Sequence, residues 1–211
     1  MVIRPIIPFV FDSGVTLDSK FFLLASLMAC LAAVAALALA GYCSERYETD
    51  RKKTALMSAI IAVSVTLIMI CFFGCSAIAV KGIVLLSVLA LSSFEDIRTR
   101  ECDDHLHVLI AVAAFIGTDI KRLPEMILAG FFAGSIIVLS KLIGKGKIGG
   151  ADIKLAAASA FLLGFNRGIF GLLVGTVLAV IVNLLKKNRK SGFPMIPYLA
   201  AGFSAAFLMS G

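Results

Sequence analysis

The sequence predicts an all-α polytopic membrane protein, a bundle of about eight transmembrane helices, from its composition and its apolar runs. Hydrophobic residues make up 60% of the 211 residues and charged residues only 16%, whereas soluble domains keep about a quarter of their residues charged. The mean hydropathy is +1.03. A soluble fold is excluded, because so few charges could not cover a surface in contact with water. Helices are the expected spanning form, because each satisfies its own backbone hydrogen bonds in lipid.

The expected elements follow one another with short polar connections. Residues 1–19 contain two prolines and are expected to form an extended or surface-lying tail. We then expect helices at 21–42, 55–73, 76–94, 105–118, 124–143, 152–165, 168–185 and 194–210. This divides the chain into the tail at 1–19, two additional N-terminal transmembrane helices at 20–75 and a six-helix core at 76–211.

Two of these runs, 105–118 and 152–165, are shorter than the ~20 residues that a full crossing needs. We expect them to begin below the membrane surface or to lean on neighbouring helices, which would leave a water-accessible notch beside the polar stretches that they flank. Two Gly-x-x-x-Gly pairs, Gly130 with Gly134 and Gly171 with Gly175, are interpreted as helix-packing faces.

The basic residues are divided unevenly between the two sides of the membrane. If the loops alternate sides, one side holds 14 of the 20 Lys and Arg residues: Arg46, Arg51, Lys52, Lys53, Arg98, Arg100, Lys141, Lys145, Lys147, Lys154, Lys186, Lys187, Arg189 and Lys190. Cytoplasmic loops are enriched in Lys and Arg, so this side is expected to be cytoplasmic, with both termini outside. The basic residues lie in short loops, which favours a role in topology in the cytoplasmic membrane over nucleic-acid binding.

Two polar stretches on that side each carry a carboxylate beside an apolar run. Asp152 follows a glycine-rich loop, and the simplest interpretation is a helix N-cap. Lys154 complicates this, since a cation in the first turn opposes the helix dipole. Asp96 directly follows the run 76–94 and faces the negative end of its own helix dipole, an unfavourable place without a partner or a function. For Arg98 and its polar neighbours the alternative is a solvated juxtamembrane loop.

The two carboxylates are expected to lie on one side of the membrane at similar depth. Two carboxyl groups in a partly desolvated site cannot both ionise, so they share a proton. One then acts as a base on a water molecule while the other polarises a peptide carbonyl. This chemistry requires neither a metal nor a covalent intermediate.

The motifs around these residues resemble the type IV prepilin peptidase and preflagellin peptidase family of GxGD-type membrane aspartyl proteases. The similar stretches are Asp96-Ile97-Arg98-Thr99-Arg100 followed by Leu106, Gly149-Gly150-Ala151-Asp152-Ile153-Lys154-Leu155, and Pro194-Met195-Ile196-Pro197-Tyr198-Leu199-Ala200. The resemblance implies that Asp96 and Asp152 are catalytic and that Gly149, Gly150, Ala151 and Lys154 support the motif. It also implies cleavage of the short basic leader from pilin-like precursors of type IV pilus or protein-secretion systems, at the cytoplasmic face, with no cofactor.

The chain departs from the family pattern in two places. Ala151 replaces the second glycine of Gly-x-Gly-Asp, which reduces the backbone freedom of the loop. The chain has Cys102-Asp103-Asp104 where the family has Ile-Pro-Asn. With Glu101, this gives three acids within four residues, and we hypothesise that Glu101, Asp103 and Asp104 bind the basic leader.

Longer members of the family carry a domain with paired zinc-binding cysteines and also methylate the new N-terminus. Here the loop from Cys43 to Thr54 is too short for a domain, and the five cysteines include no Cys-x-x-Cys pair. We therefore expect peptidase activity without methyltransferase activity. His105 and His107 are two residues apart and would point to different sides of a helix, so no metal site is expected.

Two other functions are compatible with parts of this pattern. A proton-coupled transporter would also have intramembrane acids, short spans and glycine-rich loops. However, no inverted repeat is visible, and the acids gather at one face. A catalytically inactive relative that acts in secretion-system assembly is left open by the motif departures. The sequence does not indicate an oligomeric state.

Overall fold

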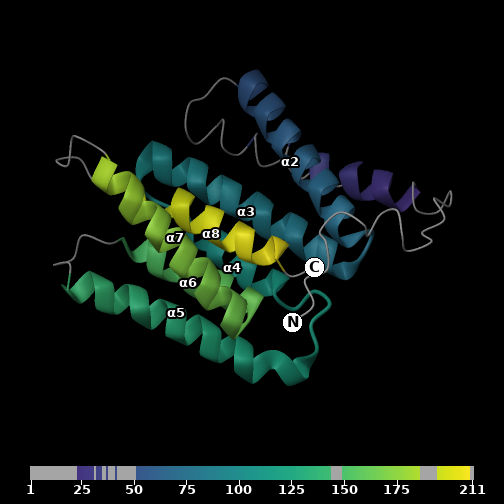
Figure 1. Cartoon of the computed structure of the whole chain (residues 1–211). Helices are drawn as coiled ribbons and strands as arrows, with labels where there is room; N and C mark the ends of the chain where they lie inside the picture. The colour runs from purple at the N-terminus through teal and green to yellow at the C-terminus, as the bar shows by residue number, and fades with distance from the viewer. Residues whose placement is uncertain are drawn as a thin grey trace. The chain divides into compact units, whose positions relative to one another are not determined.

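The structure is a computed structural model that describes residues 23–30, 32–34, 37, 41, 51–143, 149–185 and 194–209. Every regular element in these ranges is a helix, which confirms the all-α fold class (Figure 1). The elements are α2 (Arg51–Phe73), α3 (Ala77–Thr99), α4 (Asp104–Ala113), the 3₁₀ helix η1 (Ile120–Arg122), α5 (Leu123–Ile143), α6 (Gly150–Leu163), α7 (Phe165–Leu185) and α8 (Ile196–Leu208).

Within the described ranges, four of the predicted spans form helices that are long and apolar enough to cross a membrane. These are Lys52–Phe73, Ala77–Thr99, Ile120–Ile143 and Phe165–Leu185. By contrast α4, α6 and α8 have only 10, 14 and 13 residues, or about 15 to 21 Å of helix against a hydrocarbon core of about 30 Å. The runs 105–118 and 152–165, which were predicted to be short, form the short helices α4 and α6. The last run, 194–210, forms α8, which is shorter than expected.

Parts of the N-terminal prediction lie outside the described residues. The first predicted span is helical at 23–30, 32–34, 37 and 41, and its other residues are not described. The tail at 1–19 and most of the glycine-rich loop, at 144–148, also lie outside the described residues.

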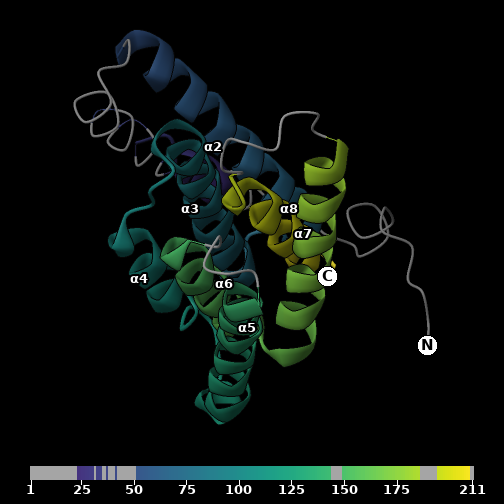
Figure 2. The same ribbon diagram turned by 90° about the vertical axis from the view of Figure 1, so that its left-hand side faces the viewer.

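The chain divides into two compact units, residues 1–83 and 84–211. The second unit contains α4 to α8 and the greater part of α3, and it holds both motif aspartates. Within this unit α6 is the central helix, since it contacts α4, α5, α7 and α8 (Figure 2).

Small residues allow the neighbours of α6 to approach it closely. A Cβ atom on Gly130 of α5 would lie 3.0 Å from the carbonyl oxygen of Ala157, and one on Gly168 of α7 would lie 2.8 Å from the Cα of Ala160. A Cβ on Gly134 would meet the Cβ of Ala157 at 3.4 Å. The packing interpretation of Gly130 and Gly134 is thus confirmed.

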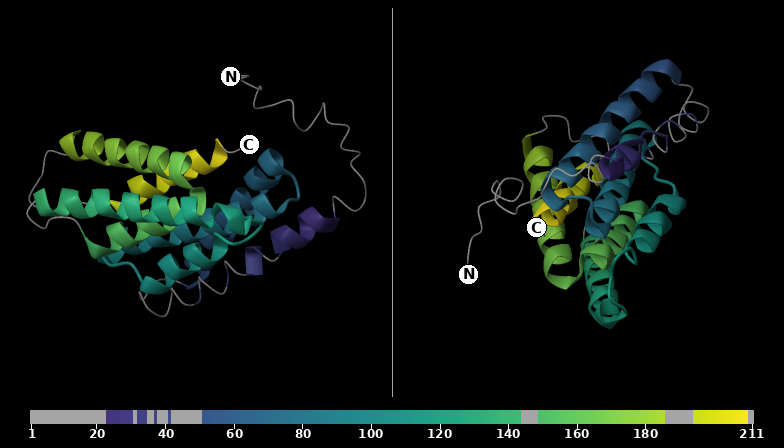
Figure 3. Two further views of the ribbon diagram at one scale, coloured as in Figure 1. Left: turned by 90° about the horizontal axis from the view of Figure 1, so that it is seen from below. Right: turned by 90° about the vertical axis from the view of Figure 1, so that its right-hand side faces the viewer.

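The closest packing joins α7 to α8, which lie side by side (Figure 3). A Cβ on Gly202 of α8 would collide with the carbonyl oxygen of Gly171 and the backbone nitrogen of Gly175, and it would lie 2.7 Å from the Cα of Gly175. Only a glycine fits where two backbones are this close. Gly171 and Gly175 are therefore packing residues, as predicted, and Gly202 completes the contact from the other helix.

Candidate active site

Asp96 lies on the buried stripe of α3. The residues of this stripe recur at helical spacing: Leu85, Leu89, Ser92 and Asp96, with Asp96 only 8% exposed. The helix was expected to end at residue 94, but it continues to Thr99, so Asp96 lies within its last turns and not in the following loop. The polarity of residues 95–99 was mistaken for the end of the helix.

A backbone amide from a distant segment holds the carboxylate of Asp96. The N–H of Ile196 donates a hydrogen bond to Oδ2 of Asp96 at 3.0 Å. Ile196 is the first residue of α8, so Asp96 lies at the positive end of the α8 dipole. This contact offsets the unfavourable position of the carboxylate at the carboxyl end of α3.

Arg100 ends α3 in a left-handed conformation. Its φ of 60° is the only positive φ of a non-glycine residue among the described residues, and its N–H donates to the carbonyl oxygen of Asp96 at 3.1 Å. A non-glycine residue in this region is strained by about 1 to 3 kcal/mol, and such strain is common at functional sites. The turn redirects the chain toward α4 directly after the motif that begins with Asp96.

Asp152 is the third residue of α6 and is 7% exposed. Gly149, and not Asp152, is the N-cap, and the N–H of Gly149 donates to Oδ2 of Asp152 at 3.0 Å. The N-cap interpretation of Asp152 is thus wrong by three positions, although its carboxylate does satisfy a backbone donor at this helix end. Ala151 is already helical, so the replacement of glycine there requires no unusual backbone angle and favours the helix.

The two aspartates interact electrostatically within the second unit. Burial, and next the negative charge of Asp96, raise the pKa of Asp152 to about 6. The helix that carries Asp152, α6, is too short to cross a membrane, and Asp152 lies in its first turn. This carboxyl group is therefore outside the four helices that are long enough to cross. A negative charge nearby makes it harder for Asp152 to ionise, so its carboxyl group keeps its proton at a higher pH than an ordinary aspartate does.

The structure places the other predicted site residues at the start of α4 and of α6. Nζ of Lys154 donates to Oδ1 and Oδ2 of Asp104 at 2.7 and 2.8 Å, and this partner lowers the pKa of Asp104. Asp103 is half-buried and Glu101 is exposed. The predicted leader-binding acids are therefore not equivalent, because Asp104 is already engaged by the lysine of the second motif.

Sequence reasoning did not assign a role to Glu95, which is 1% exposed. Its Oε2 accepts a hydrogen bond from the N–H of Asp103 at 3.1 Å. The signal that could have identified it is the apolar spacing of α3, which places Ser92 and Glu95 on the buried side together with Asp96. A charged residue on such a stripe has a partner or a function.

His107 and Cys102 are poor candidates for catalysis. His107 is 6% exposed, and burial lowers the pKa of its imidazole, which favours the neutral form. Burial, followed by the nearby acids Glu95, Asp96 and Asp103, raises the pKa of the Cys102 thiol to about 11, so the nucleophilic thiolate is disfavoured. Among the described residues no group of three or more His, Cys, Asp or Glu side chains could hold a metal ion.

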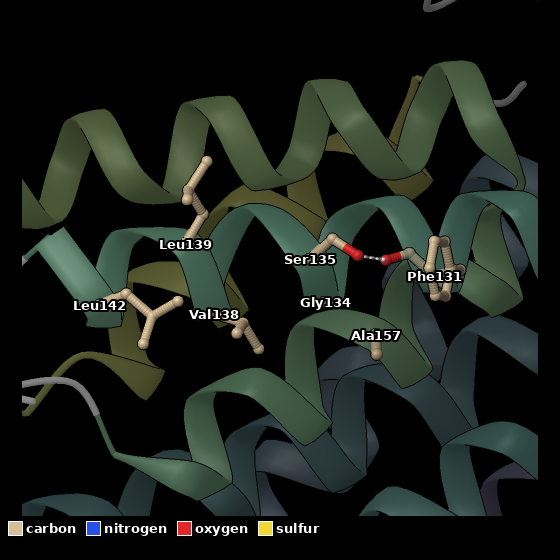
Figure 4. Close-up of a pocket in the computed structure, with 8 residues that line it drawn as sticks. Phe131, Gly134, Ser135, Val138, Leu139, Leu142 and Ala157 are labelled. Carbon is tan, nitrogen blue, oxygen red and sulfur yellow. Dashed lines mark hydrogen bonds between the residues drawn. The ribbon is translucent and has the colours of Figure 1, made fainter.

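A groove elsewhere in the unit is apolar and contains neither aspartate. It is lined mainly by α5, including Gly134, Val138 and Leu142, with Ala157 of α6 on its other side (Figure 4). The Ser135 hydroxyl in this groove donates to the Phe131 carbonyl of its own helix at 2.7 Å. With no titratable side chain in its lining, the groove offers no acid–base chemistry.

The fold and the site together define a membrane protein in which two helices bring buried, coupled carboxyl groups together. Residues 83–184, just under half of the chain, match the model of the type IV leader peptidase family. The family recognised from the sequence is thus confirmed, and the protein is a membrane peptidase. The matched segment includes Asp96 and Asp152, whereas α8 lies beyond it. No curated protein and no solved structure matches the chain.

Proposed function

We propose that the protein is an aspartyl endopeptidase that removes the short basic leader from pilin-like precursors at the cytoplasmic face of the cell membrane. The observation that carries this proposal is the electrostatic coupling of two buried carboxyl groups, Asp96 from α3 and Asp152 from α6. The match to the type IV leader peptidase family supports the substrate class.

The mechanism uses the two carboxyl groups as an acid and a base. The ionised member removes a proton from a water molecule, and the protonated member polarises the carbonyl of the scissile peptide. Backbone N–H groups of Ile196 and Gly149 hold Oδ2 of Asp96 and of Asp152, respectively. These hydrogen bonds orient the two carboxyl groups for the water and the peptide.

Purified protein in detergent or lipid tests the function on precursors that carry a basic leader followed by an apolar helix. We expect a single cut between the leader and the helix, no effect of metal chelators, and no methylation of the new N-terminus. Loss of cleavage on chelation with recovery on zinc addition would contradict the aspartyl mechanism. No cleavage of any precursor, with proton-coupled uptake into vesicles, would favour the transporter. The absence of both activities would favour an inactive relative.

The orientation in the membrane gives a separate prediction. The charge bias places residues 44–54, 95–105, 141–151 and 186–193 in the cytoplasm. Single cysteines introduced at Thr49 and Asn188 should then be shielded from an impermeant thiol reagent in intact cells and react after permeabilisation. Reaction of both from outside would invert the orientation and place the site on the wrong side.

Leader recognition gives a prediction about Glu101 and Asp103. Acids at the edge of the site attract a basic leader over a distance, and salt screens this attraction. The double variant Glu101→Gln/Asp103→Asn should raise the KM for basic leaders and flatten its salt dependence, with kcat little changed. A fall in kcat without a change in KM would show that these acids belong to the chemistry or to the fold of the loop.

A further inference from the structure

Two side-chain contacts connect the end of α3 to the start of α6 through the start of α4. Glu95 of α3 accepts the N–H of Asp103 at 3.1 Å, and Asp104 accepts Nζ of Lys154 of α6 at 2.7 and 2.8 Å. Glu95 is adjacent in sequence to Asp96, and Lys154 is two residues beyond Asp152. These four residues, Glu95, Asp103, Asp104 and Lys154, are called the α4 bridge below.

Burial of the Glu95 carboxyl group, at the α3 end of the bridge, costs free energy of folding. Glu95 is 1% exposed, and its Oε1 has no hydrogen-bond partner among the described residues. A buried polar group without its partner costs about 1 to 3 kcal/mol, so the carboxyl group destabilises the fold on this side. In return for this cost, the buried carboxyl group holds the backbone of Asp103 through its Oε2.

At the α6 end of the bridge, the ion pair of Lys154 and Asp104 contributes more to the relative position of the two helix starts than to the stability of the fold. Lys154 lies in the first turn of its helix, where a cation is unfavourable, and Asp104 lies in the first turn of α4, where an acid is favourable. Their side chains are 54% and 70% exposed, and exposed ion pairs contribute at most about 1 kcal/mol. The lysine donates to both carboxylate oxygens, which joins the starts of α4 and α6.

The bridge depends on the residue types at positions 103 and 104. A proline at position 103 would have no N–H to donate to Glu95. An asparagine at position 104 would have no charge to offer Lys154. Both contacts therefore belong to the Cys102-Asp103-Asp104 sequence of this protein.

We propose that the α4 bridge sets the spacing of Asp96 and Asp152, with Glu95, Asp104 and Lys154 as positioning residues. This inference rests on the proposed peptidase function. The bridge connects the same two helices as the electrostatic interaction between the two aspartates. It begins one residue from Asp96 and ends two residues from Asp152. Displacement of a reacting group by about 1 Å can cost a hundred-fold in rate, so a weak contact that controls distance has a larger effect on catalysis than on stability.

The first test is a double-mutant cycle on precursor cleavage. Asp104→Asn and Lys154→Gln should each lower kcat by about three- to a hundred-fold with little change in KM, and the double variant should be no slower than the slower single variant. Glu95→Gln keeps an oxygen that can accept the Asp103 N–H and should retain most of kcat, whereas Glu95→Leu should not. Lys121→Gln, at an exposed lysine on η1, is the matched control. Additive losses, or equal losses for Glu95→Gln and Glu95→Leu, would overturn the bridge.

The second test measures spacing without activity. In a protein whose natural cysteines are replaced, Asp96→Cys and Asp152→Cys are joined by a short bifunctional thiol reagent. The yield of crosslinked protein should fall by at least about three-fold when Lys154→Gln is added and should be unchanged by Lys121→Gln. An unchanged yield in both overturns the bridge, whatever the activity. If the wild-type protein cleaves no precursor while the yield falls as expected, the bridge stands and the proposed function fails.

Discussion

Asp96→Asn and Asp152→Asn will each lower kcat for precursor cleavage by about a hundred- to ten-thousand-fold. Neither amide can act as the acid or the base of a carboxyl pair, and a pair that shares a proton needs both members. Each asparagine keeps a side-chain oxygen to accept the N–H of Ile196 or of Gly149, respectively, so the fold should be retained. Single-turnover cleavage of a purified precursor is the measurement.

The matched control for these variants is Asp119→Asn. Asp119 is exposed, and its side chain accepts a local hydrogen bond from the N–H of Lys121 at 3.0 Å, so its replacement should leave kcat unchanged. Size-exclusion profiles in detergent should be the same for all three variants. If either motif variant turned over at more than about a tenth of the wild-type rate, the aspartyl mechanism would be wrong.

Gly202→Ala will have the largest effect on stability of any single methyl group added to the second unit. The new Cβ would collide with backbone atoms of Gly171 and Gly175, and backbone cannot rotate away as a side chain can. Overpacking costs about 1 to 3 kcal/mol where side chains can move, so we expect about 3 kcal/mol or more here. Thermal unfolding in detergent should show a clearly lower Tm and loss of cleavage.

Ala201→Val adds two methyl groups at the neighbouring residue, which is exposed, and serves as the control. Its Tm should change little, because the added atoms face the outside of the unit. A Gly202→Ala protein with a normal Tm would show that α7 and α8 are farther apart than the structure places them. Retained stability with lost cleavage would instead assign Gly202 a role in the site.

The helices and the two candidate aspartates can be found in the sequence because both appear as local patterns. Apolar runs mark each helix, and a carboxylate beside such a run is conspicuous. The apolar run ends at residue 94 and charged residues follow it, but α3 continues to Thr99 because Glu95 and Asp96 extend the buried stripe of Leu89 and Ser92.

The partners of the site residues could not be predicted in the same way. The N–H that holds Asp96 belongs to Ile196, 100 residues later in the chain, and any residue except proline has such a group. The pairing of Asp104 with Lys154 spans 50 residues, and many other basic residues were available on the same predicted side. Such contacts are decided by how the helices pack, which residue type alone does not specify.

The interlocking of Gly202 with Gly171 and Gly175 also fixes the height of α8 along α7. A helix rises by about 5.4 Å per turn, so a slip of one turn would carry the first amide of α8 well beyond the 3.0 Å at which Ile196 holds Asp96. A one-turn slip would bring Tyr198 or Ala206, four residues to either side, to the place of Gly202, and the Cβ of either residue would not fit between the two backbones. Only one position of α8 along α7 is therefore allowed. The contact in the middle of α8 thus determines where its first amide meets the carboxylate of Asp96.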